Sequence, residues 1–189
     1  MNDQKIRQHL KASRLKKYVD DPKSLVVDEL GLRHGAGRVD VAVINGVIHG
    51  YEIKGETDTL RRLPVQSDTY NSVLDRATIV AAERHIEGAF RLLPEWWGVI
   101  TVANKGDSMK MRLLRPARKN PTKSPLAVAK LLWKPEALLA LEELGKADGM
   151  KSKNRLEIYK RLAAATSLRQ LGVIVRSQLL RRKNWRSGG

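Results

Sequence analysis

The sequence of 189 residues contains no cysteine. Disulfide bonds, thiolate metal sites and thiol redox chemistry are therefore excluded, and the composition fits a reducing cytoplasm. Histidine is also scarce, since only four are present and none of them has a metal-ligand spacing to another. A zinc site of the usual nitrogen and sulfur ligands is accordingly not expected.

Long hydrophobic runs are missing as well. The longest, such as residues 96–103, fall far below the roughly 18 residues that a membrane-spanning helix needs. Residues 1–11 are polar and charged, unlike a signal peptide. We therefore expect a cytoplasmic chain without a membrane partner. Its hydrophobic content of 42% lies in the globular range, and its length allows one well-buried domain or a small domain with an added module.

Acidic residues are few in the second half of the chain. Residues 1–100 hold 15 Lys and Arg against 14 Asp and Glu, whereas residues 101–189 hold 21 against 6. A positive surplus confined to one end is typical of proteins that bind a polyanion, because each neutralised phosphate releases a counterion. A solvated basic face without a ligand is the alternative, and no basic amphipathic helix with bulky aromatics supports a membrane surface. Nucleic acid is the expected partner.

Strands and helices alternate over the first two thirds of the chain. Asn2 or Asp3 can cap a helix that ends before Pro22, and residues 25–32 suit a helix or a strand. The expected order then continues as strands 39–44 and 47–54, a helix from Thr57 or Asp58 to about Asp75, strand 77–82, helix 83–93, and strands 96–103 and 109–114. This order predicts an α/β domain over residues 1–118.

Residues 115–125 contain three prolines and four basic residues, a composition that indicates a linker. The helical patterns that follow, at 126–133, 135–144, 152–165 and 167–183, predict a small helical module over residues 119–189. Its basic side chains suit contacts with phosphates, which carry no sequence specificity by themselves. The candidates are Lys151, Lys153, Arg155, Arg181, Arg182 and Lys183. A helix-turn-helix and a plain helical clamp both remain open.

The strongest candidate site lies on the two strands that flank Asn45-Gly46, a strong hairpin signal. One strand carries Asp40, and the other carries Glu52 and Lys54. Side chains two residues apart on a strand point to the same face, so Glu52 and Lys54 face the same way. An exposed, salt-bridged strand face is the alternative for such a pair.

The turn decides whether Asp40 joins Glu52. If Ile44 pairs with Val47, Asp40 lies opposite Tyr51 and the acidic pair is lost. If the turn is three residues long or carries a bulge at Gly46, Ile44 pairs with Ile48 and Asp40 lies opposite Glu52. A nucleolytic site requires the second register.

Two converging carboxylates could hold Mg²⁺ or Mn²⁺, which are favoured here because the ligands are oxygens. The ammonium of Lys54 could orient the attacking water and stabilise negative charge at a phosphate. Further candidates are Gln66 and Tyr70, which share one face of the next helix, with a solvated face as the alternative. Glu29 is a candidate ligand or outer base, with Asp28 as its rival.

With Glu29, Asp40, Glu52 and Lys54 in this order, and Gln66 and Tyr70 on the following helix, the sequence resembles the PD-(D/E)XK nuclease superfamily. Residues 24–103 carry the resemblance, which is closest to a family of small bacterial and phage proteins through the segments Arg38-Val-Asp40, Gly50-Tyr-Glu-Ile-Lys54 and Arg62-Leu-Pro. Val39 stands where proline is common. The resemblance implies a restriction-endonuclease-like mixed sheet flanked by helices, a metal held by Asp40 and Glu52, and a water assisted by Lys54.

These residues predict a Mg²⁺- or Mn²⁺-dependent DNA nuclease, with Arg38 and Arg62 beside the site as further nucleic-acid contacts. The alternative is a catalytically silent DNA-binding or regulatory protein that keeps the fold, since the superfamily includes inactive members. A hydrolase of small phosphate esters or an RNA-directed toxin is the third option. A homodimer is compatible with cutting of both strands, but no dimer face is recognisable in the sequence.

Overall fold

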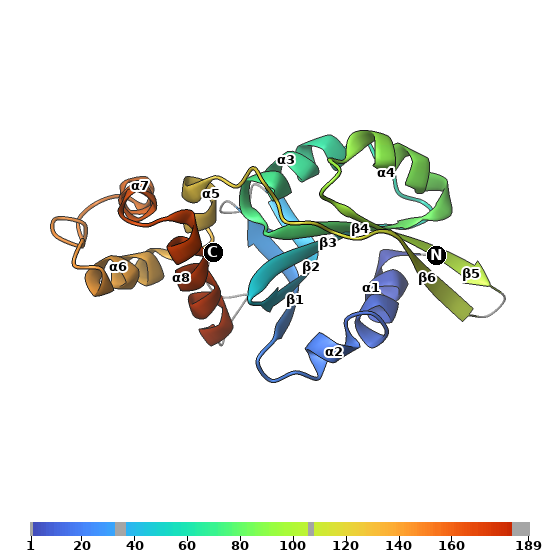
Figure 1. The fold of residues 1–189 in the computed structure, drawn as a ribbon, viewed down its shortest axis with the longest axis horizontal. Coiled ribbons are helices and arrows are strands. Elements are labelled where there is room, and N and C mark those ends of the chain that lie inside the picture. The colour runs from blue at the N-terminus through green and yellow to red at the C-terminus, as the bar shows by residue number, and fades with distance from the viewer. Residues whose placement is uncertain (1, 33–36, 106–107, 183–189) are drawn as a thin grey trace.

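A computed structural model describes residues 2–32, 37–105 and 108–182 as a mixed α/β fold (Figure 1). Its centre is one sheet of six strands in the order β1-β2-β3-β4-β5-β6. The strands are β1 (Leu25–Leu32), β2 (Gly37–Asn45), β3 (Val47–Lys54), β4 (Arg76–Ala82), β5 (Gly98–Lys105) and β6 (Ser108–Arg115). The pairs β3–β4 and β4–β5 are parallel and the others antiparallel, so the predicted mixed sheet is confirmed.

Helices cover both faces of the sheet (Figure 1). On one face, α1 (Asp3–Ala12) and α2 (Lys16–Val19) belong to a core that includes Ile6, Leu10 and Val41. On the other face, α3 (Leu63–Val73), the short 3-10 helix η2 (Glu83–His85) and α4 (Ile86–Leu92) follow β3 and β4 as crossover connections. Tyr70 and Val73 of α3 are buried in the core on this face, and the Tyr70 hydroxyl contacts Arg38 of β2 and Glu52 of β3.

Several boundaries differ from the sequence prediction. Residues 25–32 form a strand, which resolves the ambiguity of that segment. Helix α3 begins at Leu63, so the caps predicted at Thr57 or Asp58 are wrong. Pro64 lies in the first turn of α3, where its missing N–H costs no intrahelical hydrogen bond. The carboxylate of Asp58 instead accepts a hydrogen bond from the backbone N–H of Gly55 at 2.7 Å.

Residues 116–124 form no helix or strand, as their composition predicts, but they are tied closely to α3 and to the residues that follow it. The buried side chain of Asn120 donates to the carbonyls of Asn71 at 2.7 Å and Leu74 at 2.8 Å. The backbone N–H of Ser124 donates to the carbonyl of Ser72 at 2.9 Å. These contacts fix the path of the chain into the C-terminal helices.

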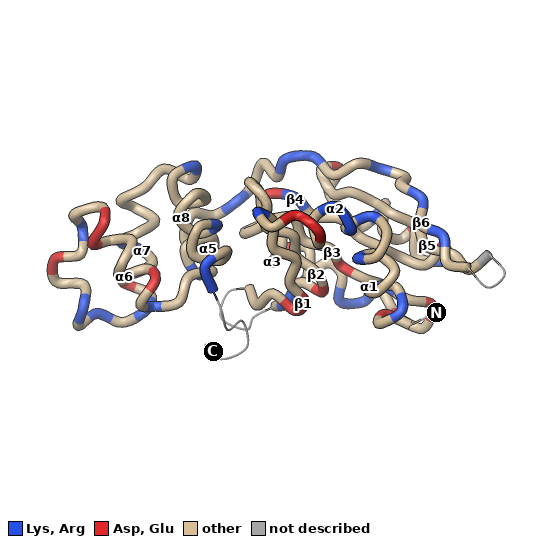
Figure 2. The backbone as a smooth tube through the Cα atoms, turned by 90° about the horizontal axis from the view of Figure 1, so that it is seen from below, with Lys and Arg blue, Asp and Glu red and all other residues tan. Residues whose placement is uncertain are grey.

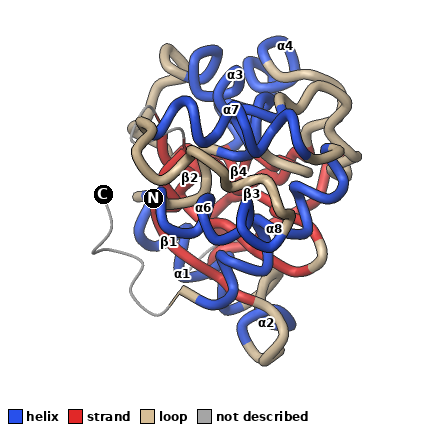
Figure 3. The backbone as a smooth tube through the Cα atoms, turned by 90° about the vertical axis from the view of Figure 1, so that its left-hand side faces the viewer, coloured by secondary structure: helices blue, strands red, loops and turns tan. Residues whose placement is uncertain are grey.

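The C-terminal helices lie at one end of the molecule, in front of the strands in Figure 3. They are α5 (Pro125–Ala129), α6 (Lys134–Glu143), α7 (Arg155–Ala165) and α8 (Leu168–Arg181). One hydrophobic cluster extends without a break from Ile44 and Leu74 to Leu132, Leu162 and Val175. The helical part therefore packs directly on the sheet part. Within the described ranges, no helix is long and apolar enough to cross a membrane.

Candidate active site

The β2–β3 hairpin has the register that an acidic pair requires. Ile44 lies opposite Ile48, Asn45 lies opposite Val47, and Gly46 alone occupies the turn with a φ of 61°. Glycine reaches this left-handed conformation without the steric cost of a Cβ atom. Of the two registers left open by the sequence, the one that places Asp40 opposite Glu52 is confirmed.

Strands β2 and β3 separate at Asp40. Their last backbone pair is Val41 with Tyr51, and beyond it β2 continues to pair with β1 alone. The carboxylate of Asp40 takes over the next position, since its Oδ2 accepts a hydrogen bond from the backbone N–H of Ile53 at 2.7 Å. Separation of the strands thus leaves the Asp40 carboxylate between them, beside Glu52.

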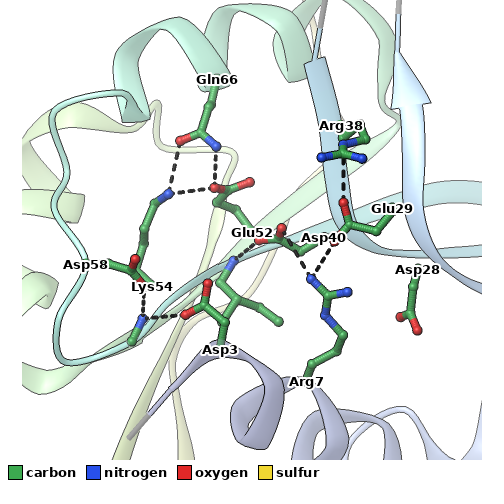
Figure 4. A network of polar contacts seen from close by, with 12 residues as sticks. Asp3, Arg7, Asp28, Glu29, Arg38, Asp40, Glu52, Lys54, Asp58 and Gln66 are labelled. Carbon is green, nitrogen blue, oxygen red and sulfur yellow. Dashed lines mark hydrogen bonds and ion pairs between the residues drawn. The ribbon is translucent and has the colours of Figure 1, made fainter. Parts of the chain in front are cut away.

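Glu52 is held by three side chains, and its own side chain is 2% exposed. Nζ of Lys54 lies 2.8 Å from its Oε1, Nε2 of Gln66 donates to the same oxygen at 2.6 Å, and the Tyr70 hydroxyl donates to Oε2. Nζ of Lys54 also donates to Oε1 of Gln66 at 3.1 Å (Figure 4). The structure therefore brings Gln66 and Tyr70 of α3 together with Glu52 and Lys54 of β3.

Burial and nearby charges raise the pKa values of Asp40 and Tyr70, which both adjoin Glu52. Burial, followed by repulsion from Glu52, raises the pKa of Asp40 to about 7, against the lowering effects of the Ile53 N–H, Arg7 and Lys54. Burial and the adjacent Glu52 also raise the pKa of Tyr70 well above its ordinary value, so its hydroxyl stays protonated and can donate. Asp40 and Glu52 therefore form a close carboxylate pair in which the negative charge of Glu52 disfavours ionisation of Asp40.

The oxygen ligands of this pair fit a hard divalent cation. Mg²⁺ is often bound through one or two carboxylates, with water and substrate phosphates completing its coordination. Asp40 and Glu52 could supply those carboxylates. Among the described residues, no group of three or more His, Cys, Asp or Glu side chains is placed to hold a metal ion.

Glu29 and its rival Asp28 have different partners, and Figure 4 shows those of Glu29. Glu29 has a φ of 58°, and its carboxylate contacts Nη2 of Arg7 at 2.7 Å and Nε of Arg38 at 3.2 Å. Asp28 pairs instead with Lys11 at 2.5 Å. Glu29 therefore adjoins the acidic pair through Arg7, whose Nη2 lies 3.6 Å from Oδ1 of Asp40.

The sequence interpretation missed the contribution of α1 to this site. Arg7 lies between Ile6 and Leu10, the buried residues of α1, so it borders the face that packs on the sheet. That position was a recognisable signal. Asp3 was missed too: its Oδ1 accepts from the Gly55 N–H at 3.3 Å, next to Asp58, and burial followed by its interactions with Asp58 raises the pKa of Asp3 to about 6.

Comparison with known proteins shows the sequence family of the chain. The family model of bacteriophage P4 protein cII matches residues 2–186. The chain belongs to this family. Protein cII of Enterobacteria phage P4 is 25% identical over 93 residues, which cover 49% of this chain and 35% of that relative. No solved structure matches, and the resemblance to PD-(D/E)XK nucleases stays a hypothesis.

The cII family match includes both the sheet and the C-terminal helices. The basic residues predicted to contact nucleic acid differ in their exposure and in their partners. Figure 2 shows Lys and Arg on both parts of the chain. Arg38 is 68% exposed beside Glu29, and Arg62 is exposed at the start of α3. Arg155 and Arg181 are exposed, Lys151 pairs with Glu142, Lys153 pairs with Glu157, and Lys183 lies outside the described residues.

Arg182 differs from the other predicted basic contacts because its side chain is 6% exposed. It donates to the carboxylate of Glu136 and to the carbonyl of Leu131, and its guanidinium lies 4.4 Å from the centre of the Trp133 ring. These contacts join the end of α8 to the start of α6 and to the segment before it. Arg182 therefore has a structural role in the helical part.

Proposed function

We propose that the chain is a metal-dependent nuclease of the PD-(D/E)XK type that hydrolyses phosphodiester bonds of DNA. One observation carries the proposal: the strands separate where Asp40 lies opposite Glu52, and Nζ of Lys54 contacts Glu52 at 2.8 Å. An exposed salt-bridged strand face, the alternative for this sequence pattern, does not fit a lysine side chain that is 8% exposed. Buried charged groups with a strongly shifted neighbour are typical of functional sites.

In this mechanism Asp40 and Glu52 would hold Mg²⁺ or Mn²⁺. Such a cation, when bound, neutralises charge on the phosphate and makes a bound water more acidic. The protein positions these two acids in different ways. A backbone N–H holds Asp40, whereas Gln66 and Tyr70 of α3 hold Glu52.

Lys54 is the residue that we assign to the attacking water. Its ammonium has three N–H donors, and two of them are directed to Glu52 and Gln66. The third can donate to a water or to a phosphate oxygen. Because Glu52 and Gln66 fix the Nζ atom, the lysine can act as a preorganised positive charge where negative charge develops.

The choice of DNA as substrate rests on charge. The second half of the chain holds 21 Lys and Arg against 6 Asp and Glu, and the exposed Arg155 and Arg181 are available to phosphates. Contacts of this kind bind the backbone of nucleic acid without reading its sequence. Arg38 and Arg62 would extend the same contacts to the site.

The proposal is tested by incubating supercoiled plasmid and linear single- and double-stranded DNA with the protein in Mg²⁺, Mn²⁺ or EDTA. Cutting should require the metal and should be lost in Asp40→Asn, Glu52→Gln and Lys54→Met. Glu87→Gln is a matched control, since Glu87 is 82% exposed and pairs with Arg91 one turn away on the same helix. Absence of metal-dependent cutting, or its persistence in Asp40→Asn and Glu52→Gln, would overturn the proposal.

A second candidate is a DNA-binding or regulatory protein of the same fold without catalysis. It is favoured by the position of Arg7, whose Nη2 lies 3.6 Å from Oδ1 of Asp40, where a metal ion would need to bind. Membership of the cII family is compatible with this candidate. DNA binding that is insensitive to EDTA, with intact DNA under every metal, would identify the second candidate.

A further inference from the structure

Arg7 reaches the acidic site from a rigid element. The neighbouring Ile6, and Leu10 one turn later, are fully buried against the sheet, so α1 cannot shift freely. Nη2 of Arg7 contacts Glu29 at 2.7 Å and lies 3.6 Å from Oδ1 of Asp40 (Figure 4). A single positive charge is thus fixed between two carboxylates of the site.

Arg7 has a donor that this arrangement leaves unused. Its Nε is buried and has no hydrogen-bond partner among the described residues. A buried donor without a partner costs free energy. The planar guanidinium can donate two parallel hydrogen bonds to a phosphate, just as it can to a carboxylate. When the guanidinium turns away from Asp40, its Nε can reach a phosphate oxygen and gain the hydrogen-bond partner that it lacks in this structure.

The oxygen atoms of Asp40 are unequally available. Oδ2 accepts the hydrogen bond from the Ile53 N–H, while Oδ1 is the oxygen nearest to Arg7. A cation bound to Asp40 would therefore approach through Oδ1 and meet the positive charge of Arg7. Two like charges at such a separation repel strongly in a partly buried site.

We propose that Arg7 and a divalent cation compete for Asp40, and that Arg7 contacts a phosphate of the bound nucleic acid once the cation takes its place. This inference rests on the proposed nuclease function. It assigns to α1 a substrate-binding residue and a means of limiting metal binding when no nucleic acid is present. Arg7 would thus contact either of two anionic groups, the Asp40 carboxylate or a phosphate, from its fixed place on α1.

The first half of the test measures Mn²⁺ binding to the full chain by calorimetry at pH 8 without nucleic acid. Arg7→Gln should bind Mn²⁺ roughly tenfold more tightly than the unmodified chain, because a repelling charge is removed. Lys16→Gln makes the same charge change at an exposed position of α2 and should leave the affinity unchanged. Asp40→Asn should weaken binding. Circular dichroism checks that each variant is folded.

The second half measures binding of a short labelled DNA duplex in Ca²⁺, with gel analysis to confirm that the DNA stays intact. Arg7→Gln should bind about tenfold more weakly, because a charged hydrogen bond to phosphate is lost. Tighter metal binding together with weaker DNA binding is a pattern that mere loss of structure does not produce. Arg7→Lys keeps the charge without the fork, so it should bind Mn²⁺ as the unmodified chain does but bind DNA more weakly, which provides a second variant if Arg7→Gln does not fold.

The outcomes separate this inference from the function on which it rests. If Mn²⁺ binds in an Asp40-dependent manner but Arg7→Gln binds it no more tightly, the competition is disproved and the proposed metal site stands. If DNA binding is unchanged in Arg7→Gln, the phosphate contact is disproved. If neither the unmodified chain nor Arg7→Gln binds Mn²⁺, both the inference and the proposed function fail.

Discussion

Arg182 donates two hydrogen bonds to Glu136 across 46 residues of sequence, from Nε at 2.7 Å and from Nη2 at 2.6 Å. The side chains are 6% and 13% exposed, so both charges are almost entirely removed from water. A buried charge requires its partner, since solvent cannot replace it. This pair therefore connects the end of α8 to the start of α6.

Loss of this pair should destabilise the protein strongly. Arg182→Ala leaves Glu136 buried without its partner, and we expect a loss of about 3 to 5 kcal/mol in the free energy of unfolding, measured with urea. Lys151→Ala is the matched control, because Lys151 is 79% exposed in its pair with Glu142. Its effect should stay within about 1 kcal/mol. Equal effects of the two substitutions would contradict a structural role of Arg182.

Removal of the Tyr70 hydroxyl should lower the free energy of unfolding, because Glu52 loses a hydrogen-bond donor. Tyr70→Phe retains the ring that stacks on Trp97 at 5.4 Å between centroids but deletes the donor to Oε2 of Glu52. A buried acceptor that loses its partner costs about 1–3 kcal/mol of unfolding free energy. Urea unfolding of Tyr70→Phe beside Tyr18→Phe, a change at a partly buried tyrosine of α2, tests this expectation. A stability equal to that of the unmodified chain would show that the hydroxyl contributes nothing.

Asp40 should make the metal-free protein less stable as the pH rises. Its pKa is about 7 in the folded state and 3.8 as the ordinary value, so between these values the folded chain holds a proton that the unfolded chain has lost. The stabilisation is complete below about pH 4 and is lost as the pH passes 7. In EDTA, Asp40→Asn should remove this loss, seen as a smaller decrease in melting temperature between pH 5 and pH 8. An unchanged pH profile would contradict it.

His49 should make the protein less stable as the pH falls, the opposite of the effect of Asp40. Burial, followed by the charge of Arg76, lowers the pKa of His49 from 6.5 to about 4. Because the unfolded chain binds the proton first, stability is complete above about pH 6.5 and is lost as the pH falls toward 4. His49→Gln can still contact Thr78, the partner of His49 at 2.8 Å, but does not titrate. Its melting temperature should fall less between pH 7 and pH 4, and a parallel fall in both proteins would disprove the assignment.

Local patterns were sufficient for much of the fold. The Asn45-Gly46 turn, the β-branched residues on each side of it and the alternation of strands with helices predicted an α/β sheet, which the structure confirms. They also placed Glu52 and Lys54 on one face, because side chains of a strand repeat every two residues. The start of α3 was mispredicted, since the preference of Thr57 and Asp58 for helix caps is weaker than the contacts that hold residues 55–62 as a loop.

The amino-acid sequence by itself determined the class of the fold, the acidic and basic residues available for chemistry and the two registers open to the hairpin. Tertiary structure alone decided that Asp40 lies opposite Glu52, that Arg7 of α1 joins them, and that Arg182 pairs with Glu136. The reason is physical. Periodicity reports which face of one element is buried, whereas contacts between distant elements depend on how those faces pack and on which buried charges must then be paired.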